Sequence, residues 1–243
     1  MTRRLRAAWR LPRCVLHGLH GLAVVLWRFP KLDAAGRHAR VRWWSAKLLR
    51  VMGIALRVEG TAAAGGALLV ANHVSWLDII AIHALLPHAR FVSKAAVKAW
   101  PLLSHLVSAG GTLYLERERA RDALRVVHLM AAALTAGETV AVFPEGTTSD
   151  GRTLLPFHAN LLQAAIATAS PVQPVALRFS DARSAVSSAV EFVGETTLAQ
   201  SLWRVACADR LVVHVTLLPP RASAGAARRE LAGALRAAIG AAL

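Results

Sequence analysis

Residues 67–87 read ALLVANHVSWLDIIAIHALLP and contain a complete strand, loop and helix. The first five residues are an apolar run of the length that a buried strand takes. Residues 77–86 are again apolar except for Asp78 and His83, and the run stops at Pro87, which indicates a helix that ends there. Between the two lies the polar loop NHVSWLD, residues 72–78. This order of elements is the first half of a strand–helix–strand unit, so the stretch predicts an α/β fold.

The same alternation continues to the end of the chain. We predict strands at 67–71, 91–93, 112–115, 139–143, 172–179, 188–193 and 211–218. Helices are predicted at 77–86, just before Pro101, at 120–136, 160–169 and 197–207, and from Ser223 onward. The pattern favours a mostly parallel sheet flanked by helices. The polar loops after strands, at 72–78, 116–119 and 144–158, are then expected to meet at one end of the sheet.

The first 60 residues have a different character, because they are both basic and apolar. MTRRLRAAWRLPR precedes a run of 14 residues, 14–27, that lacks Asp, Glu, Lys and Arg. A spanning helix needs roughly 20 apolar residues, and no small-residue cleavage site follows the run. We therefore favour a helix that lies in a membrane interface, with an ordinary helix packed on the core as the alternative.

A second basic and apolar stretch, residues 40–58, carries Trp43 and Trp44. We expect it to pair with the first stretch as an antiparallel helix pair that rests on lipid. The chain is accordingly divided into membrane-associating helices at 1–60 and an α/β domain at 61–243.

Composition narrows the class of protein. The 243 residues are 55% hydrophobic, and 29 Lys and Arg against 14 Asp and Glu give a formal charge of +15. Such a charge favours polyanions, either nucleic acid or an anionic membrane, unless it only reflects a coding bias toward Arg and Ala. The charge is spread along the chain and the tryptophans mark its apolar N-terminal part, which argues against a nucleic-acid-binding module. Cys14 and Cys207 stand far apart, so neither a disulfide framework nor a zinc site is supported.

The loop at 72–78 carries the first candidate chemistry. His73 leaves the end of a strand and Asp78 follows five residues later, a spacing that lets the carboxylate reach the imidazole. A carboxylate on one ring nitrogen leaves the other free to take a proton. Ser75 and Asp78 could instead form a capping box, and His73 could be a structural histidine. A metal site built from His73, Asp78 and His83 is disfavoured, because His83 should face the core.

Two further segments follow strands. GTLYLER, residues 111–117, places Arg117 where a guanidinium can bind phosphate or carboxylate, although a solvated charge run is the alternative. FPEGTTS, residues 143–149, has Glu145 and Gly146 in a turn whose N–H groups can bind an anion, or which is simply a turn. No GxSxG pentapeptide is present, which argues against an α/β hydrolase.

Together these segments resemble the glycerolipid acyltransferase family, the lysophosphatidic acid acyltransferases and their relatives. NHVSWLD matches the family's His-x4-Asp motif, GTLYLER its Gly-x5-Arg block and FPEGT its Phe-Pro-Glu-Gly-Thr block. PVQPVA, residues 171–176, fits the fourth block, a strand that carries proline. The blocks occur in family order, and the basic N-terminal helix pair looks like the family's membrane anchor. The expected fold is therefore the glycerol-3-phosphate acyltransferase type.

The resemblance implies acyl transfer without a covalent intermediate and without a metal or cofactor. His73 would act as general base on a lysolipid hydroxyl, which attacks the thioester of acyl-carrier protein or acyl-CoA, and Asp78 would orient the imidazole. The acceptor most favoured is 1-acyl-sn-glycerol-3-phosphate, giving phosphatidic acid. The expected location is the cytoplasmic face of the inner membrane, with monotopic attachment to an anionic surface. The residues expected to bind the acceptor are Arg117, Glu145, Gly146, Thr147 and Lys94.

One departure from the family pattern bears on the acceptor. Makers of phosphatidic acid commonly carry Arg after EGT, where this chain has Thr148. The missing cation weakens the case for a phosphate-bearing acceptor. The stretch EGTTSDG, followed by LLPFHANLLQAA, also resembles relatives that acylate lyso-ornithine lipid, which is the alternative acceptor. A non-catalytic scaffold that binds membranes is the alternative from another class.

Overall fold

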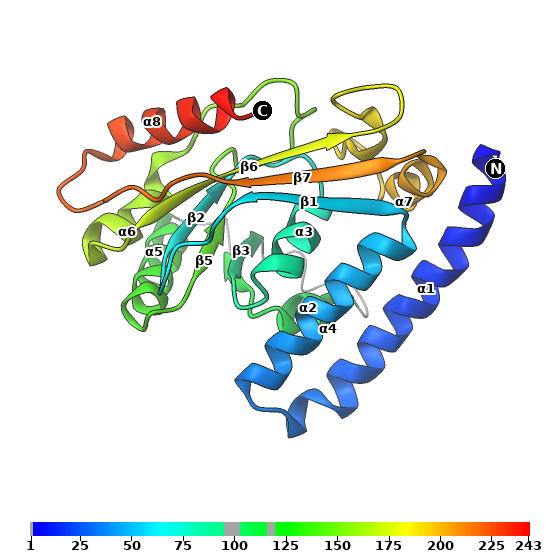
Figure 1. Cartoon of the computed structure of the whole chain (residues 1–243). Coiled ribbons are helices and arrows are strands. Elements are labelled where there is room, and N and C mark those ends of the chain that lie inside the picture. Colours follow the sequence, from blue (N-terminus) through cyan, green and yellow to red (C-terminus); the bar gives the residue numbers. More distant parts are fainter. Residues whose placement is uncertain (1, 95–102, 116–119) are drawn as a thin grey trace.

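A computed structural model describes residues 2–94, 103–115 and 120–243, and these residues form a seven-stranded sheet with helices on both faces (Figure 1). The strand order across the sheet is β1-β7-β6-β2-β5-β3-β4. The strands are β1 (Ile54–Gly60), β2 (Leu68–Ala71), β3 (Arg90–Lys94), β4 (Leu113–Leu115), β5 (Val140–Val142), β6 (Val172–Ser180) and β7 (Leu211–Leu217).

The sheet is mixed, but most of its strand pairs are parallel. β2 pairs parallel with both β5 and β6, β3 with β5 and β4, and β1 with β7. Only the pair of β6 and β7 is antiparallel among the strands described. β2 is buried along its whole length, as expected for a central parallel strand covered on both faces. The predicted fold class, a mostly parallel sheet flanked by helices, is confirmed.

Helices cover the two faces of the sheet as separate layers (Figure 1). Leu69 and Ala71 of β2 pack in one core cluster with residues of α2, α3 and α7, whereas Leu68 and Val70 pack in the other with residues of α5, α6 and α8. The α-helices are α1 (Arg3–Trp27), α2 (Ala34–Val51), α3 (Leu77–Leu85), α4 (Leu103–Ala109), α5 (Ala120–Thr135), α6 (Gln163–Thr168), α7 (Leu198–Cys207) and α8 (Arg228–Ala241), and the 3-10 turns are η1 (Phe29–Lys31), η3 (Ala159–Leu162) and η4 (Ser188–Val190).

The predicted N-terminal helix pair is present as α1 and α2, which run antiparallel (Figure 1). His17 and Trp44 join them with two reciprocal contacts, His17 Nε2 to Trp44 O at 2.9 Å and Trp44 Nε1 to His17 O at 3.1 Å. Gly21 lets the indole approach, since a Cβ there would lie 2.3 Å from Trp44 Nε1. Arg10 also links α1 to the C-terminal end of α7 by donating to the carbonyls of Ala206 and Ala208.

Three predicted elements are wrong in part. Residues 54–58 were expected in the second N-terminal helix, but they belong to β1, because Gly53 ends α2 with a φ of +72°. Residues 188–193 were expected as a strand, but Ser187 caps the short turn η4 instead. The last helix was expected from Ser223 and begins at Arg228, because the Ser223 hydroxyl is buried against two carbonyls of the preceding segments.

Other expectations are untested. The helix predicted before Pro101 and the loop at 116–119 lie outside the described residues. The division of the chain at residue 60 stays a prediction, although β1 shows that residues on its N-terminal side contribute a strand to the sheet.

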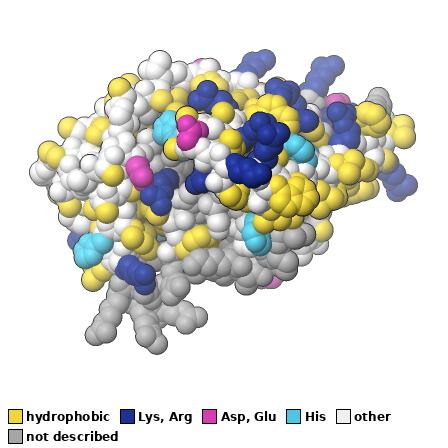
Figure 2. Space-filling model, turned by 90° about the horizontal axis from the view of Figure 1, so that it is seen from below, with side chains coloured by type: hydrophobic (Ala, Val, Ile, Leu, Met, Phe, Trp, Pro, Cys, Tyr) yellow, Lys and Arg dark blue, Asp and Glu magenta, His cyan; other side chains and the backbone are white. Residues whose placement is uncertain are grey.

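One face of α1 exposes apolar side chains to solvent. At 100° per residue they fall within an arc of about 120°, so they form a single stripe along the helix. Figure 2 shows hydrophobic and basic side chains side by side on the face seen from below. No described helix is long and apolar enough to cross a membrane. The members of the α1 stripe are Leu5, Trp9, Val15, Leu16, Leu19, Leu26 and Trp27.

Candidate functional site

The loop between β2 and α3 brings His73 and Asp78 together. His73 Nδ1 lies 2.8 Å from Asp78 Oδ2, and the two side chains are 18% and 0% exposed. A carboxylate accepts the proton of Nδ1, so the basic nitrogen of the neutral ring is Nε2. The imidazole is thus accessible and oriented, whereas its carboxylate partner is sealed from water.

Asp78 also organises the backbone of this loop. Its Oδ2 accepts hydrogen bonds from the N–H groups of Val74, at 2.7 Å, and Ser75, at 2.9 Å. The capping-box alternative is wrong, because the helix N-cap is Trp76 and the Ser75 hydroxyl has no partner among the described residues. The carboxylate therefore binds both the imidazole and the two residues that follow it.

Asn72 anchors the start of the loop to the neighbouring strand. Its side chain donates to Leu177 O at 2.9 Å and accepts from Leu177 N at 2.8 Å, and the residue is fully buried. The amide thereby continues the pairing of β2 with β6 for one more residue. The position of His73 is fixed to the sheet through this contact.

The FPEGT segment after β5 lies directly against His73. The Phe143 ring stacks on the imidazole with centroids 3.9 Å apart and planes 9° from parallel. Glu145 Oε1 accepts the His73 N–H at 2.7 Å, and Glu145 Oε2 accepts the Leu155 N–H at 2.9 Å. Burial raises the pKa of the Glu145 carboxyl, and its hydrogen bonds oppose that shift. Gly146, with a φ of +72°, makes the turn possible.

The residues after this turn contact the loop at 72–78. Ser149 N donates to His73 O at 2.8 Å, and Phe192 N donates to Val74 O at 3.3 Å. The Thr148 hydroxyl donates to the Phe192 carbonyl. Thr147 is exposed at the rim. Three separate segments of the chain therefore meet at His73.

Five of the predicted site residues are in this place: His73, Asp78, Glu145, Gly146 and Thr147. Lys94 is the last residue of β3, but its side chain lies outside the described part of the structure, as does the whole of Arg117. The roles of all seven in catalysis or substrate binding stay predictions at this point.

His83 does not join the site. Its Nε2 lies 3.0 Å from Ala89 O, and its ring meets that of Phe91 edge-on. Burial lowers the pKa of His83 to about 4. Across the described ranges no cluster of three or more His, Cys, Asp or Glu side chains could hold a metal ion. The expectation that His83 faces the core is confirmed.

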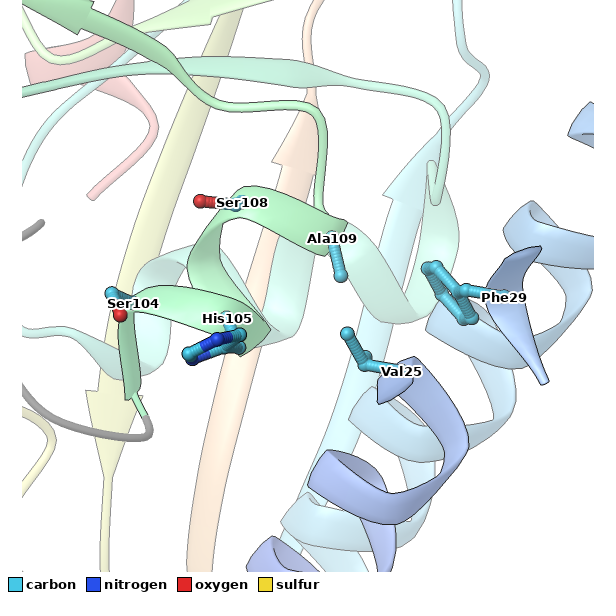
Figure 3. A pocket seen from close by; sticks show the side chains of 6 residues that line it. All are labelled: Val25, Phe29, Ser104, His105, Ser108 and Ala109. Carbon is cyan, nitrogen blue, oxygen red and sulfur yellow. The ribbon is translucent and has the colours of Figure 1, made fainter. Parts of the chain in front are cut away.

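A separate hollow of about 480 Å³ lies between the N-terminal helix pair and α4 (Figure 3). Val25 and Phe29 line one side, and His105 and Ala109 of α4 line the other. None of its lining residues belongs to the loops around His73. The hollow is therefore separate from the site around His73.

Sequence reasoning missed four contributors to the site. Asn72 was seen only as a loop residue, and Phe143 only as part of a motif. Ser149 fixes the His73 carbonyl, and Trp76 Nε1 donates to the buried Ser201 hydroxyl at 3.1 Å, which ties the loop to α7. Only Asn72 had a usable pattern, because an Asn at the end of a buried strand must have its amide satisfied.

Comparison with known proteins agrees with this geometry. The family model Acyltransferase matches residues 55–178. The chain is 38% identical over 236 residues to the lyso-ornithine lipid O-acyltransferase of Pseudomonas aeruginosa, covering 94% of this chain and 90% of the relative. It is 37% identical over 150 residues to the 1-acyl-sn-glycerol-3-phosphate acyltransferase of Neisseria meningitidis, covering 62% and 58%.

A solved structure has a similar fold. The crystal structure of the 1-acyl-sn-glycerophosphate acyltransferase of Thermotoga maritima superposes with a TM-score of 0.69 at 20% identity, over 96% of this chain and 95% of that one. The family model spans the loops that meet at His73, and the similarity to the Pseudomonas relative extends over nearly the whole chain. The chain belongs to the Acyltransferase family, whose members are enzymes of lipid biosynthesis.

Proposed function

We propose that this protein is a membrane-bound O-acyltransferase that moves a fatty acyl chain from a thioester donor to the free hydroxyl of lyso-ornithine lipid. The observation that carries the chemistry is the contact of His73 with the buried Asp78, beside the EGT turn. A solvent-accessible imidazole held by a sealed carboxylate is the arrangement that general-base catalysis requires.

In the proposed reaction His73 Nε2 takes the proton of the acceptor hydroxyl as its oxygen attacks the thioester carbonyl carbon. The C–S bond then breaks, and the imidazolium returns the proton to the departing thiolate. Asp78 stabilises the imidazolium and holds the ring in one tautomer. General-base catalysis contributes about 10²–10⁴-fold, so positioning and stabilisation of the oxyanion must supply the remainder.

The head group of the acceptor is proposed to lie over the turn that follows Glu145. Thr147 is exposed there, next to Gly146. We assign Lys94 and Arg117 to the anionic part of the head group, because the cationic side chains of Lys and Arg pair with carboxylate or phosphate.

Two observations favour lyso-ornithine lipid as the acceptor. Thr148 stands where makers of phosphatidic acid commonly carry Arg, and its hydroxyl is occupied by the Phe192 carbonyl. The relative that matches over 94% of this chain is named a lyso-ornithine lipid O-acyltransferase. Lysophosphatidate is the second candidate, because the Neisseria enzyme named for that acceptor is 37% identical over 150 residues.

The exposed stripe on α1 supports attachment to one face of a membrane. Cations stand over two tryptophans of the helix pair, Arg13 above Trp9 at 4.9 Å and Lys47 above Trp43 at 4.6 Å. An apolar face with basic side chains beside it is typical of a helix that lies in the interface of an anionic membrane. We place the protein at the cytoplasmic face of the inner membrane, where acyl-carrier protein or acyl-CoA can supply the acyl chain.

The test is an acceptor-by-donor grid with purified protein in detergent. Lyso-ornithine lipid and lysophosphatidate are each offered with acyl-carrier-protein and CoA thioesters, and diacylated products are measured by mass spectrometry. We expect product only when a lysolipid is present, with the higher kcat/KM for lyso-ornithine lipid. A higher kcat/KM for lysophosphatidate would make lysophosphatidate the preferred acceptor. No product in any combination would favour the non-catalytic scaffold.

A further inference from the structure

We infer that Glu145 is a positioning residue, which holds the catalytic histidine through the backbone and does not bind the acceptor head group. The inference rests on the proposed function, because it assumes that His73 is the base. The resemblance to the family implied that Glu145 binds the acceptor, and the inference differs from that expectation.

Both oxygens of Glu145 are occupied by backbone groups. Oε1 accepts the N–H of His73 at 2.7 Å, and Oε2 accepts the N–H of Leu155 at 2.9 Å. The residue is only 3% exposed. A side chain this buried, with each oxygen already bonded, is poorly placed to meet a head group that arrives from the rim.

The contact with His73 completes a set of three. Consecutive N–H groups of the loop are held by two buried carboxylates, His73 by Glu145, and Val74 and Ser75 by Asp78. Such bonds to charged acceptors are stronger than those between neutral groups. Together they fix the backbone on both sides of the His73 Cα, and therefore the direction in which the imidazole leaves the chain.

The second oxygen of the Glu145 carboxylate binds the segment that follows the turn. The Leu155 N–H is bound to Oε2, and the His158 N–H donates to Pro144 O at 2.8 Å. Glu145 therefore holds both the loop that carries Thr147 and the backbone of His73, the proposed base. Because misplacement of a reacting group by about 1 Å can cost about 10²-fold in rate, losing this link should slow the chemical step.

The charge of Glu145 also disfavours contact with the anionic part of either head group. A phosphate or carboxylate of a head group would be repelled by an ionised Glu145, and Asp78 lies close enough to add to that repulsion. A carboxylate here is instead useful as an acceptor for N–H groups, because both of its oxygens can accept.

The test compares Glu145→Gln with Glu138→Gln in the full-length enzyme. Glutamine keeps the size of the side chain, but its NH₂ group must face one of the two N–H donors, so one hydrogen bond is lost. Glu138 is exposed and pairs with Arg90, which makes it the matched control. For Glu145→Gln we expect kcat to fall by about 10²-fold per folded molecule, with the acceptor KM within twofold of wild type. A large rise in the acceptor KM with unchanged kcat would make Glu145 a head-group ligand and overturn the inference.

A second readout separates positioning from loss of stability. In protein labelled with ¹⁵N-histidine, the proton on His73 Nδ1 reports its bond to Asp78. We expect this resonance to shift in Glu145→Gln and to be unchanged in Glu138→Gln. If Glu145→Gln does not fold, Glu145→Asp, which shortens the reach by one carbon, is measured in the same way. An unchanged resonance in the folded variant would contradict the inference.

If His73→Ala keeps turnover, the protein is still an acyltransferase, but His73 is not its base. If no combination of donor and lysolipid gives product with the wild type, the proposed function itself is wrong. If His73→Ala abolishes turnover while Glu145→Gln keeps the wild-type kcat, only the role given to Glu145 is wrong.

Discussion

The loop after β2 and the outward face of α1 differ in how their side chains find partners. In the loop, Asp78 and Glu145 are buried and accept four backbone N–H groups and one imidazole N–H between them. On α1, apolar side chains such as Leu16, at 65% exposed, and Trp27, at 73%, meet no protein layer.

The two regions differ in whether their side chains have partners within the chain: the carboxylates of the loop do, and the apolar side chains of the α1 stripe are exposed to solvent. The two buried carboxylates of the loop are bound by backbone N–H groups of the same chain, and these bonds fix its conformation. Exposing an apolar stripe to water costs free energy, and contact with a lipid surface would remove that cost. The proposed chemistry thus belongs to the hydrogen-bonded loop, and the proposed membrane attachment belongs to the exposed stripe.

The largest effect should come from removing the charge that the loop encloses. Asp78→Asn keeps an oxygen for the backbone N–H groups but no longer stabilises an imidazolium. In the Ser-His-Asp enzymes the corresponding change costs about 10⁴-fold, and we expect a loss of that order in kcat/KM. Asp33→Asn, which preserves the N-cap of α2, is the matched control. Retention of a third or more of the wild-type rate in Asp78→Asn would show that the buried charge is not needed.

The next effect concerns His83, which lies just past the loop on α3. Its pKa is lowered to about 4 by burial, whereas the unfolded chain has the ordinary value of 6.5. The unfolded state therefore takes up a proton first as the pH falls. The stability associated with a neutral His83 is complete above pH 6.5 and is lost progressively down to about pH 4, by about 3 kcal/mol.

Urea unfolding at pH 7 and pH 4 checks this value. The free energy of unfolding of the wild type should fall by about 3 kcal/mol more between the two pH values than that of His83→Gln, which cannot titrate. Equal pH dependence in the two proteins would mean that His83 is not held neutral in the core.

Placing charge on the exposed apolar stripe of α1 tests whether this stripe contacts the membrane. The double variant Leu16→Glu, Leu19→Glu should bind anionic vesicles roughly tenfold or more weakly, since burying one leucine is worth about 1.5–3 kcal/mol. Turnover in detergent micelles should stay within twofold, because both leucines lie on the exposed face of α1 and none of the described hydrogen bonds around His73 involves them. Leu124→Glu, at an equally exposed leucine of α5, serves as the control in a vesicle flotation assay. Unchanged flotation of the double variant would remove α1 as the membrane contact.

The smallest effect is expected at the rim of the loop. Thr148→Arg adds the cation that phosphatidic acid makers commonly carry, and a charge-assisted bond of about 1.5 kcal/mol corresponds to roughly a tenfold change. The ratio of kcat/KM for lysophosphatidate to that for lyso-ornithine lipid should rise accordingly. Thr153→Arg adds the same charge at an exposed position nearby and should leave the ratio unchanged. A constant ratio in Thr148→Arg would mean that this position does not select the acceptor.

How far the sequence predicts the structure depends on the kind of contact. The strand at β2, the helix α3 and the pairing of His73 with Asp78 follow from local patterns, because each is set within about a dozen residues. The proximity of the EGT turn also follows, since the carboxyl ends of neighbouring parallel strands meet at one edge of a sheet.

Contacts made by the backbone are harder to predict. The bond from the His73 N–H to Glu145 joins residues 72 apart in the chain, and no pattern in either segment specifies it. β1 was missed for a related reason: its pairing with β7 is decided by a strand that follows more than 150 residues later, while its own basic and apolar composition resembles that of the helix before it. The turn η4 was missed because Ser187 and the bond of Phe192 to Val74 override the local strand pattern.

The most direct test of the account is the rate of lysolipid acylation by His73→Ala in detergent, with its unfolding midpoint measured alongside. We expect kcat/KM to fall by at least about 10²-fold while the midpoint stays at the wild-type value. A folded His73→Ala protein that acylates lysolipid at nearly the wild-type rate would contradict it.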